Sequence, residues 1–362
     1  MRRPRPRPRL VADRRPGRRG SGRPRAAASR RGGRNGSRSS GSQRARLRGA
    51  AGHCHARRKH QGKGQRMDRV GFIGLGNMGR PMAANIRRKQ FPVAVFDLSP
   101  GPVAALVELG AEAAPDVAAL AGGADVVVTM LPGPREVSAT VLGPVLAHIR
   151  PGSVVLDMST VDPETTDALA AACAARGIGF VDAPVGRLAA HAERGESLFM
   201  VGGTEADVAR VRPLLEAMGS TIHHCGPAGS GTRTKLVNNY LAILLCQMNA
   251  EALSLATAFG LDLAKTLEVL HGTTATNGQL AVNWPNKVLK GDTAPGFAID
   301  LAHKDLSLIV QAANAARVPL PMAAAGRETF SAARARGMGG QDFSAMLDAQ
   351  CAASGLTPPR LG

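Results

Sequence analysis

Short apolar runs alternate with helix-like stretches through the chain from residue 70 to residue 228. The runs are rich in valine and isoleucine, which is typical of strands that are covered on both faces of a sheet. We expect strands at 70–73, 93–96, 125–130, 154–157, 179–182 and 198–201, with helices between them, including 164–176 and 205–218. Apolar strands that alternate with helices predict an α/β fold with a doubly wound, largely parallel sheet.

The pattern changes after residue 228, where strand-forming residues become rare and alanine, leucine and methionine recur with helical spacing. A Gly-Ser-Gly run at 229–231 predicts a flexible loop that leads into a long helix, since no helix breaker follows before Gly260. Further helices are expected at 263–270, 301–316 and 326–336. The pattern therefore predicts a first domain at 67–228 and an all-α C-terminal domain at 229–362.

The only tryptophan of the chain, Trp284, lies in the segment 272–285, which is rich in threonine, asparagine and glycine. Such a segment can be a lid over a site or an ordinary connection between helices. We favour the connection.

The positive charge of the chain is concentrated in residues 1–66. This segment holds 23 lysines and arginines and a single acid, Asp13, whereas residues 67–362 hold 23 basic and 26 acidic residues, so the net charge of +19 arises in the first segment. Arginine, proline, glycine and serine dominate it, which predicts a disordered basic extension. It has no apolar stretch of the kind that a secretory signal needs, and we identify no run elsewhere that is long enough for a transmembrane helix.

Three interpretations of this extension remain open. It could bind nucleic acid through phosphate charge, act as an arginine-rich transit peptide, or be translated sequence upstream of the true start. We favour the third, because Met67 lies just before the first expected strand and the extension has no aromatic residue for base stacking. Nucleic acid is therefore not an expected partner. The cluster at His53–His55 with His60 lacks a second cysteine pair, so we expect no dedicated metal site there.

The five cysteines of the chain are widely spaced and form no CxxC pair. An odd number of isolated cysteines is typical of reduced thiols. We therefore expect a cytoplasmic protein.

A glycine motif follows the first expected strand directly. Gly74, Gly76 and Gly79 form a GxGxxG pattern between a strand and an amphipathic helix, as a dinucleotide-binding turn requires. Glycines permit the tight turn, and the helix N-terminus offers amide donors to a pyrophosphate. Asp97 ends the next strand, where an acid can accept the ribose hydroxyls and would repel a 2′-phosphate. The motif predicts a Rossmann-type domain that binds NAD in preference to NADP.

Ligands in such sheets bind beyond the carboxyl ends of the strands. The segments that we expect there are Leu131-Pro132, Ser159-Thr160 and 182–187. They are the candidates for further contacts with a cofactor or a substrate.

Three polar residues share one face of the long helix. Lys235, Asn238 and Asn239 fall at i, i+3 and i+4 on an otherwise apolar segment. A lysine flanked by two carboxamides can place a proton donor beside groups that hold a substrate oxygen. The same pattern suits a solvated lysine with two polar neighbours. This stretch alone leaves both interpretations open.

Seven sequence blocks resemble the β-hydroxyacid dehydrogenase family in order and spacing. They are GFIGLGNMGRPMAANI, TMLP, DMSTVDP, DAPV, LFMVGG, GSGTRTKLVNN and AHKDL, and the resemblance extends from Met67 to the C-terminus. It implies a Rossmann-type domain, a helical domain that forms homodimers or homotetramers, and a catalytic lysine at Lys235. It also implies cofactor contacts near Asn77, Met78, Asp97, Leu131, Thr160 and Lys304.

One block departs from the family pattern. Most members read DAPVSGG where this chain reads DAPVGRL from Asp182 to Leu188, so that Arg187 replaces a glycine. Together with NWPNKVL and QDFSAML, this replacement resembles the 3-sulfolactaldehyde reductase branch, in which the arginine and the adjoining helix asparagine bind the sulfonate. The resemblance implies this role for Arg187 and Asn238. The chain differs from that branch at Leu188, which cannot donate a hydroxyl, and at Ala242, where the branch has serine.

The resulting hypothesis is an NAD-dependent reductase of a short anionic aldehyde, converting 3-sulfolactaldehyde to 2,3-dihydroxypropane-1-sulfonate. Lys235 would donate the proton and Asn239 would hold the oxygen. Arg187, Asn238 and Thr160 would bind the substrate. The alternatives are a 3-hydroxyisobutyrate dehydrogenase, a 2-hydroxy-3-oxopropionate reductase or, in a different class, a catalytically inactive nucleic-acid-associated scaffold. The presence of Lys235 argues against the scaffold.

Overall fold

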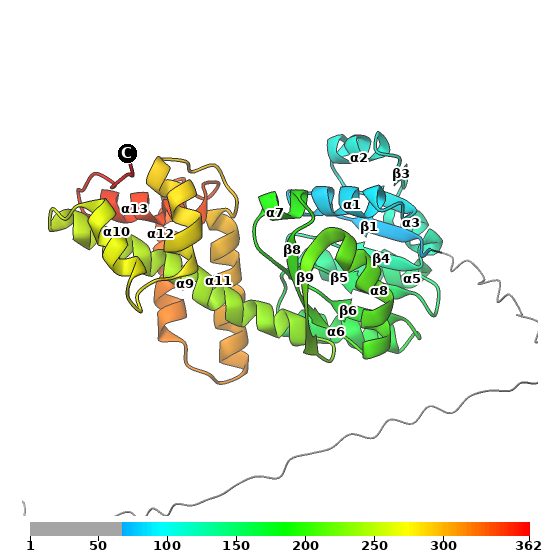
Figure 1. Cartoon of the computed structure of the whole chain (residues 1–362). Helices are drawn as coiled ribbons and strands as arrows, with labels where there is room; N and C mark the ends of the chain where they lie inside the picture. The colour runs from blue at the N-terminus through cyan, green and yellow to red at the C-terminus, as the bar shows by residue number, and fades with distance from the viewer. Residues whose placement is uncertain (1–66) are drawn as a thin grey trace, which may run out of the picture. The chain divides into compact units, whose positions relative to one another are not determined.

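The computed structural model describes residues 67–362, which fall within one compact unit, Lys63–Gly362. The expectations for the basic extension and its histidine cluster lie outside the described residues. An α/β half comes first along the described chain, and a helical half follows it (Figure 1).

The α/β half forms one sheet of nine strands in the order β3-β2-β1-β4-β5-β6-β8-β7, with β9 beside β8. Strands β1 to β6 run parallel to one another, and the chain crosses from one side of β1 to the other between β3 and β4. The expected doubly wound, Rossmann-type sheet is therefore confirmed. The strands are β1 (Val70–Ile73), β2 (Val93–Phe96), β3 (Glu112–Ala113), β4 (Val126–Thr129), β5 (Val154–Asp157), β6 (Gly179–Asp182), β7 (Val185–Gly186), β8 (Ser197–Gly202) and β9 (Gly219–Gly226).

The far edge of the sheet contains two features that the apolar pattern does not predict. β8 runs antiparallel to β6 and β7, because the chain returns after β7 through the short helix α7 (Ala189–Glu193) without a full crossover. β9 is a strand although most of its side chains are at least partly exposed. Its residues include Ser220, His223 and His224, so no apolar run marks it in the sequence.

Helices cover both faces of the sheet, because successive side chains of a strand point to opposite faces. In β4, Val126 and Val128 pack in one core with α1 and α8, whereas Val127 packs in a second core with α3, α4 and α6. The helices of this half are α1 (Gly79–Arg88), α2 (Pro100–Val107), α3 (Val117–Gly123), α4 (Pro134–Thr140), α5 (Leu146–His148), α6 (Pro163–Ala174), α7 and α8 (Glu205–Met218), with a π-helical turn at Val141–Val145.

Helices packed around one apolar core form the second half, as expected. Trp284 is 0% exposed in this core. The segment 272–285 is therefore anchored at its tryptophan, which fits a connection better than a lid. The helices are α9 (Ser230–Ala258), α10 (Leu263–His271), α11 (Ile299–Ala315), α12 (Pro321–Ala335) and α13 (Met346–Ala353), with short helical turns at 279–290 and 343–345.

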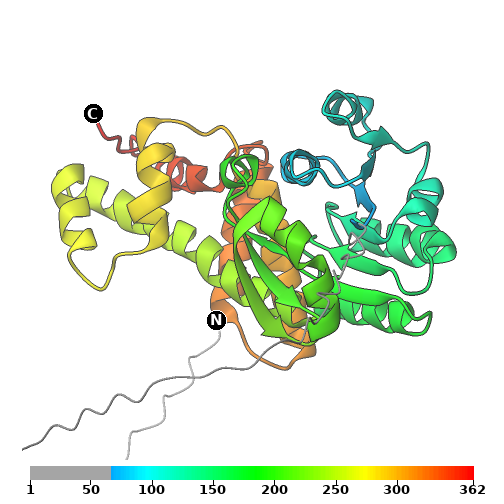
Figure 2. The same ribbon diagram turned by 45° about the vertical axis from the view of Figure 1, so that its right-hand side comes forward.

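The long helix α9 links the two halves. It packs on β8 and β9 at its start and on α11 and α13 further along (Figures 1 and 2). Ser230 and Gly231 already belong to the helix, so the expectation of a flexible loop at 229–231 is wrong. The physical reason is tertiary packing. The carbonyl oxygen of Met200 lies against Gly231 where a side chain would be, so the glycine is needed to pack the first turn of the helix on the sheet.

α9 is long and apolar enough to cross a membrane by length and composition alone, which corrects the expectation that no segment reaches that length. Half of its most apolar window is buried inside the protein. Leu236, Ile243 and Leu253 belong to the core of the helical half. We therefore describe α9 as a core helix.

Candidate active site

The glycine turn between β1 and α1 leaves the backbone open to a ligand. Gly74 has a φ of +94°, which L side chains rarely adopt, and Gly79 has no space for a side chain because the Gly74 carbonyl oxygen lies against it. A Cβ on Gly76 would meet no heavy atom within 4 Å. No side chain caps α1, but the Arg80 amide donates to the Gly76 carbonyl oxygen at 3.1 Å, so the amides that remain for an anion are those of the turn before Arg80. The turn, which also contains Asn77 and Met78, therefore fits a dinucleotide pyrophosphate.

Asp97 ties the end of β2 to the glycine turn. Its Oδ2 accepts a hydrogen bond from the Leu75 amide at 2.6 Å, and its Oδ1 accepts one from the Ser99 amide at 2.7 Å. Each carboxylate oxygen keeps a lone pair for a further donor. This position suits an acceptor for the adenosine ribose, and that role stays a prediction.

Lys304 of α11 joins the loops that follow β4 and β5. Its Nζ donates hydrogen bonds to the carbonyl oxygens of Pro132 and Thr160, both at 3.1 Å. The Leu131 amide donates to Ser159 Oγ at 2.9 Å and ties the same two loops. The structure thus brings Leu131, Pro132, Thr160 and Lys304 together at the carboxyl edge of the sheet.

Lys235 of α9 reaches β7, the short strand that follows β6. Its Nζ donates a hydrogen bond to the Val185 carbonyl oxygen at 2.6 Å. Burial lowers the pKa of Lys235 below its ordinary range, while the negative charge of Asp305 partly opposes this effect and the positive charge of Lys304 adds to it. An ammonium with a lowered pKa gives up its proton more readily near neutral pH. This environment suits a proton donor and does not suit a freely solvated lysine.

The two asparagines of α9 differ in their surroundings. Asn239 is 5% exposed, and its Nδ2 donates to Asp305 Oδ2 at 2.6 Å. Asn238 is exposed, and its Nδ2 donates to Asn239 Oδ1 at 3.0 Å. A carboxylate can only accept from the amide nitrogen, so Asp305 fixes which way the Asn239 amide is turned.

Asp305 is a site residue that the sequence analysis did not assign. It is 2% exposed, accepts the hydrogen bond from Asn239, and places its Oδ1 3.1 Å from Lys304 Nζ. The negative charge of Asp305 acts on both Lys304 and Lys235. It compensates their positive charges, which would otherwise be costly to bury. The available signal was an acid inside the apolar helical block AHKDL, next to a lysine expected at the cofactor.

Arg187 follows β7, and its side chain turns toward β8 and β9. Its Nη1 donates to the Glu196 carbonyl oxygen at 2.6 Å and to Ser220 Oγ at 3.1 Å, and its Nη2 donates to Thr221 Oγ1 at 3.3 Å. Among residues 67–362, no hydrogen bond joins its guanidinium to Asn238 and no carboxylate forms an ion pair with it. The structure therefore shows these two expected substrate-binding groups bonded to other partners and not to each other.

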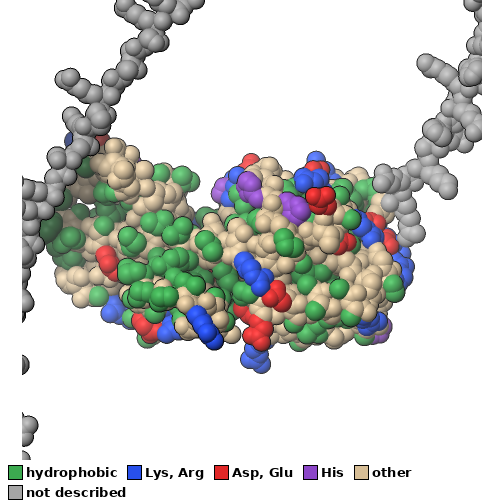
Figure 3. Space-filling model, turned by 90° about the horizontal axis from the view of Figure 1, so that it is seen from below, with side chains coloured by type: hydrophobic (Ala, Val, Ile, Leu, Met, Phe, Trp, Pro, Cys, Tyr) green, Lys and Arg blue, Asp and Glu red, His purple; other side chains and the backbone are tan. Residues whose placement is uncertain are grey.

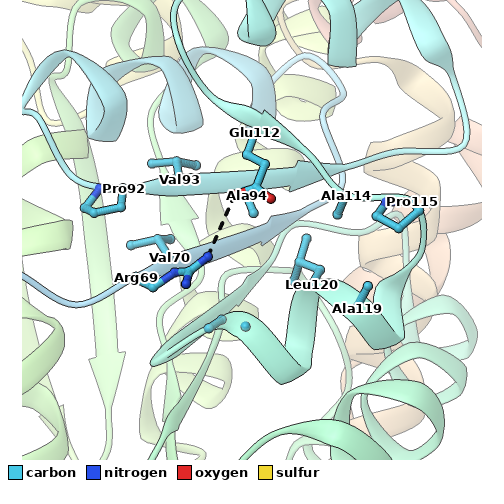
Figure 4. Close-up of a pocket in the computed structure, with 12 residues that line it drawn as sticks. Arg69, Val70, Pro92, Val93, Ala94, Glu112, Ala114, Pro115, Ala119 and Leu120 are labelled. Atoms are coloured by element: carbon cyan, nitrogen blue, oxygen red, sulfur yellow. Dashed lines mark ion pairs between the residues drawn. The ribbon is translucent and has the colours of Figure 1, made fainter.

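Two cavities lie away from these groups. One, of about 550 Å³, opens between α6, α9 and α11 and is lined mainly by apolar side chains. The other, of about 90 Å³, lies at the amino ends of β1 to β3, where Arg69 pairs with Glu112 at 3.8 Å (Figure 4). Neither is lined by Lys235, Asn239 or Lys304. In the part of the chain that the structure describes, no group of three or more potential ligands is placed to hold a metal ion.

Comparisons with known families agree with this geometry. Residues 69–226 match the NAD binding domain of 6-phosphogluconate dehydrogenase. Residues 229–350 match the family described as NAD-binding of NADP-dependent 3-hydroxyisobutyrate dehydrogenase. The fold, the glycine turn and these two matches define an NAD-dependent dehydrogenase that acts on CH–OH groups.

Individual relatives narrow this class. The chain is 43% identical to the 3-sulfolactaldehyde reductase of Escherichia coli (strain K12) over 293 residues, 80% of this chain and 98% of that protein. It is 39% identical to the 3-hydroxyisobutyrate dehydrogenase of Pseudomonas aeruginosa over 273 residues, 73% of this chain and 92% of that protein. The solved structure of Mycobacterium tuberculosis 3-hydroxyisobutyrate dehydrogenase with L-serine aligns with a TM-score of 0.73 at 32% identity, covering 78% of this chain and 99% of that one. The chain belongs to the β-hydroxyacid dehydrogenase family, whose members include 3-hydroxyisobutyrate dehydrogenase.

Proposed function

We propose that this protein uses NADH to reduce a short anionic aldehyde, and that 3-sulfolactaldehyde is the substrate and 2,3-dihydroxypropane-1-sulfonate the product. The observation that carries the proposal is Lys235, whose ammonium has a lowered pKa and donates to β7, the strand that leads to Arg187. The relative with 43% identity is a 3-sulfolactaldehyde reductase. The name of this relative supports a sulfonate substrate, and Arg187 supplies a positive charge opposite to that of the sulfonate.

The cofactor is assigned to the carboxyl edge of the sheet. The amides of the glycine turn at 74–79 bind the pyrophosphate. Asp97 accepts hydrogen bonds from the ribose and repels a 2′-phosphate, which favours NADH over NADPH. The loops after β4 and β5, tied together by Lys304, enclose the remaining part of the cofactor.

The proton chemistry is assigned to α9. The glycine turn would hold NADH, which would provide the hydride for the carbonyl carbon. Lys235 donates a proton from Nζ to the carbonyl oxygen as negative charge develops there. The second N–H of Asn239 Nδ2, which Asp305 does not use, holds the same oxygen. In the reverse direction, Lys235 accepts the proton of the alcohol.

The substrate anion is assigned to Arg187 and Asn238, with Thr160 at the reacting end. The guanidinium of Arg187 is held by neutral oxygens, and none of the described carboxylates pairs with it. A sulfonate or carboxylate is a stronger partner for a guanidinium than a hydroxyl is. Binding therefore draws the side chain from Ser220 and Thr221 toward Asn238.

A carboxylate substrate is the second candidate, as in a 3-hydroxyisobutyrate dehydrogenase or a 2-hydroxy-3-oxopropionate reductase. The observation that favours it is Leu188, whose Cδ1 lies 3.6 Å from the position of a Cβ on Gly296. This side chain lies near Gly296 and offers no hydroxyl donor. A sulfonate has three oxygens and a carboxylate two, so fewer donors favour the carboxylate. The hypothesis of an inactive nucleic-acid-associated scaffold is not retained, since the chain belongs to a family of dehydrogenases and has Lys235.

We propose further that the chain forms a homodimer or homotetramer in the cytoplasm. α9 exposes an apolar stripe of Val237, Leu241, Met248 and Leu255, each more than half exposed. Figure 3 shows apolar side chains gathered over part of the helical half. An exposed apolar face of this kind is typical of an interface between subunits. Light scattering coupled to gel filtration tests the assembly, and a monomer at micromolar concentration would contradict it.

Steady-state NADH oxidation with a panel of aldehydes tests the substrate. The panel contains sulfolactaldehyde, methylmalonate semialdehyde, tartronate semialdehyde and succinate semialdehyde. We expect kcat/KM for sulfolactaldehyde to exceed the others by about tenfold or more, because its sulfonate offers three oxygens to the donors of Arg187 and Asn238, whereas the carboxylates of the other aldehydes offer two. A higher value for a carboxylate would move the assignment to the second candidate.

A further inference from the structure

The first turn of α9 is capped by a residue from the sheet. Gly229 precedes the helix with a φ of +87° and has no side chain to cap it. Asp182 at the end of β6 accepts a hydrogen bond from the Gly229 amide on Oδ1 at 2.7 Å and one from the Thr232 amide on Oδ2 at 2.6 Å. It is 0% exposed. One buried carboxylate therefore satisfies two of the amides that a helix start leaves without partners.

The contact between Asp182 and the helix start has no spare space. A Cβ on Gly231 would lie 2.8 Å from the Asp182 carbonyl oxygen and 2.9 Å from Oδ2, and a Cβ on Gly202 would collide with Oδ1. Thr232 Oγ1 lies 3.0 Å from Thr166 Oγ1 of α6. The first turn of α9 therefore cannot slide or rotate without losing hydrogen bonds or meeting neighbouring atoms.

Lys235 follows Thr232 by less than one helical turn and returns to the segment that Asp182 begins. Its Nζ donates to the carbonyl oxygen of Val185, three residues after Asp182. The carboxylate thus holds the helix start while the carbonyl holds the ammonium. Because a helix is rigid over one turn, any shift of its first turn moves Lys235 by a similar distance. Misplacement of a reacting group by about 1 Å can lower a rate about 10²-fold.

We propose that Asp182 is a positioning residue of the reaction, which sets Lys235 against β7, the strand leading to Arg187, by capping α9. The proposal rests on the proposed role of Lys235 as the proton donor. It adds to that role the group that determines where the donor stands.

A change in position can be distinguished from a change in charge. The charges that act on Lys235 are those of Asp305 and Lys304, both on α11. Losing the negative charge of Asp182 could only lower the pKa of Lys235 or leave it unchanged. A displaced helix start would instead admit water to the ammonium and raise the pKa of Lys235 toward its ordinary value. Because Lys235 donates as an ammonium, a raised pKa moves the alkaline loss of activity to higher pH.

The Asp182→Asn variant of the full chain tests the proposal, using whichever aldehyde the wild-type enzyme reduces best. We expect kcat to fall about tenfold or more, the alkaline limb of the kcat profile to move to higher pH, and the Kd for NADH to change by less than about twofold, because the glycine turn lies on other strands. Asp262→Asn is the matched control, since Asp262 caps α10 through the Lys265 amide at 2.8 Å. It should lower Tm without moving the pH profile.

Thr232→Val is the second variant, in case Asp182→Asn does not fold. It keeps the backbone bonds and removes the hydroxyl that bonds to Asp182 and Thr166. We expect kcat to fall a few-fold and the alkaline limb of its pH profile to move again to higher pH. Thr232→Ser should restore both the kcat and the pH profile of the wild type. The proposal would be overturned if folded Asp182→Asn had the kcat and pH profile of the wild type, or if its alkaline limb moved to lower pH. If Asp182→Asn does not fold, the same outcomes in Thr232→Val would overturn it.

A readout that needs no turnover separates this proposal from the proposed function. The acetylation rate of Lys235 against pH, measured by mass spectrometry of its peptide, gives the pKa of Lys235 directly. A higher pKa in Asp182→Asn supports the positioning role, and an unchanged pKa overturns it. Failure of the wild type to reduce any aldehyde would instead overturn the proposed function.

Discussion

The two sides of the candidate site hold their groups in different ways. On the sheet side, the groups proposed to bind the cofactor are mainly backbone amides of the glycine turn, together with the loops after β4 and β5. On the helical side they are side chains, and Lys304, Asp305 and Asn239 are joined by direct contacts between α9 and α11. Backbone groups tolerate changes of neighbouring side chains, whereas a buried network of charges depends on every member. Substitutions on the helical side should therefore mainly alter the chemical step, and those on the sheet side should mainly alter cofactor affinity.

Lys235→Ala should produce the largest effect. Loss of a general acid costs roughly 10²- to 10⁴-fold in kcat, while the Kd for NADH should hardly change, because the cofactor is assigned to the sheet side. Single-turnover kinetics with fluorescence titration of NADH measure both. Lys265→Ala is the matched control, since its side chain is 80% exposed on α10 and pairs with Glu268. Normal turnover in Lys235→Ala would remove the lysine from the chemistry.

Arg187→Ala should come next and should depend on the charge of the substrate. If the anion is desolvated when bound, the variant should lose about 2–5 kcal/mol in kcat/KM for sulfolactaldehyde. Arg187→Lys keeps the charge but loses the planar fork, so it should mainly raise KM. An uncharged aldehyde of similar length should be almost unaffected. Arg194→Ala, which removes the exposed ion pair with Glu196, is the control. Equal small losses for both aldehydes would place Arg187 outside the site.

Asp305→Asn should have a smaller effect with a characteristic pH dependence. Removing a charged hydrogen-bond partner costs about 1.5–3 kcal/mol, which corresponds to about 10- to 100-fold in kcat. The negative charge of Asp305 raises the pKa of Lys235, so its loss should lower that pKa. Lys235 would then lose its proton at a lower pH, and the alkaline limb should move down, opposite to the shift expected for Asp182→Asn.

Asp300→Asn provides the control for Asp305→Asn. Asp300 lies on the same helix, is largely exposed and pairs with Arg334. Its pH profile should match the wild type. An alkaline limb in Asp305→Asn that stays in place would show that Asp305 does not act on Lys235.

The sheet side was open to prediction because its determinants are local in the sequence. A strand, a glycine turn and a helix follow one another within 70–88, and the acid of the next strand comes soon after. Parallel strands with apolar side chains on both faces can also be predicted, because they appear in the sequence as continuous apolar runs. The same rule explains why β9 was missed, since a half-exposed polar strand has no such run.

The helical side was less predictable because its contacts join distant residues. Asp305 and Asn239 are separated by 66 positions, and Asp182 and Gly229 by 47. The glycines at 229–231 favour a loop locally, yet tertiary packing needs their missing side chains to seat a helix on the sheet. The side chain of Arg187 likewise depends on Ser220 and Thr221 of β9, whose strand the pattern did not reveal.

Asp97→Ala, on the sheet side, should have the smallest effect of these substitutions. Asp97 holds the Leu75 and Ser99 amides and is the expected partner of the ribose. Its loss should weaken NADH binding by about 5- to 10-fold, the size of about one hydrogen bond, and leave kcat at saturating NADH nearly unchanged. The preference for NADH over NADPH should narrow, because the carboxylate that repels a 2′-phosphate is gone. Asp116→Ala, which removes the cap of α3, controls for the loss of an acid elsewhere on the sheet side. Fluorescence titration with both cofactors decides the matter: an unchanged NADH to NADPH ratio would place the acid away from the ribose, and a fall in kcat would mean that the sheet side also acts on the chemistry.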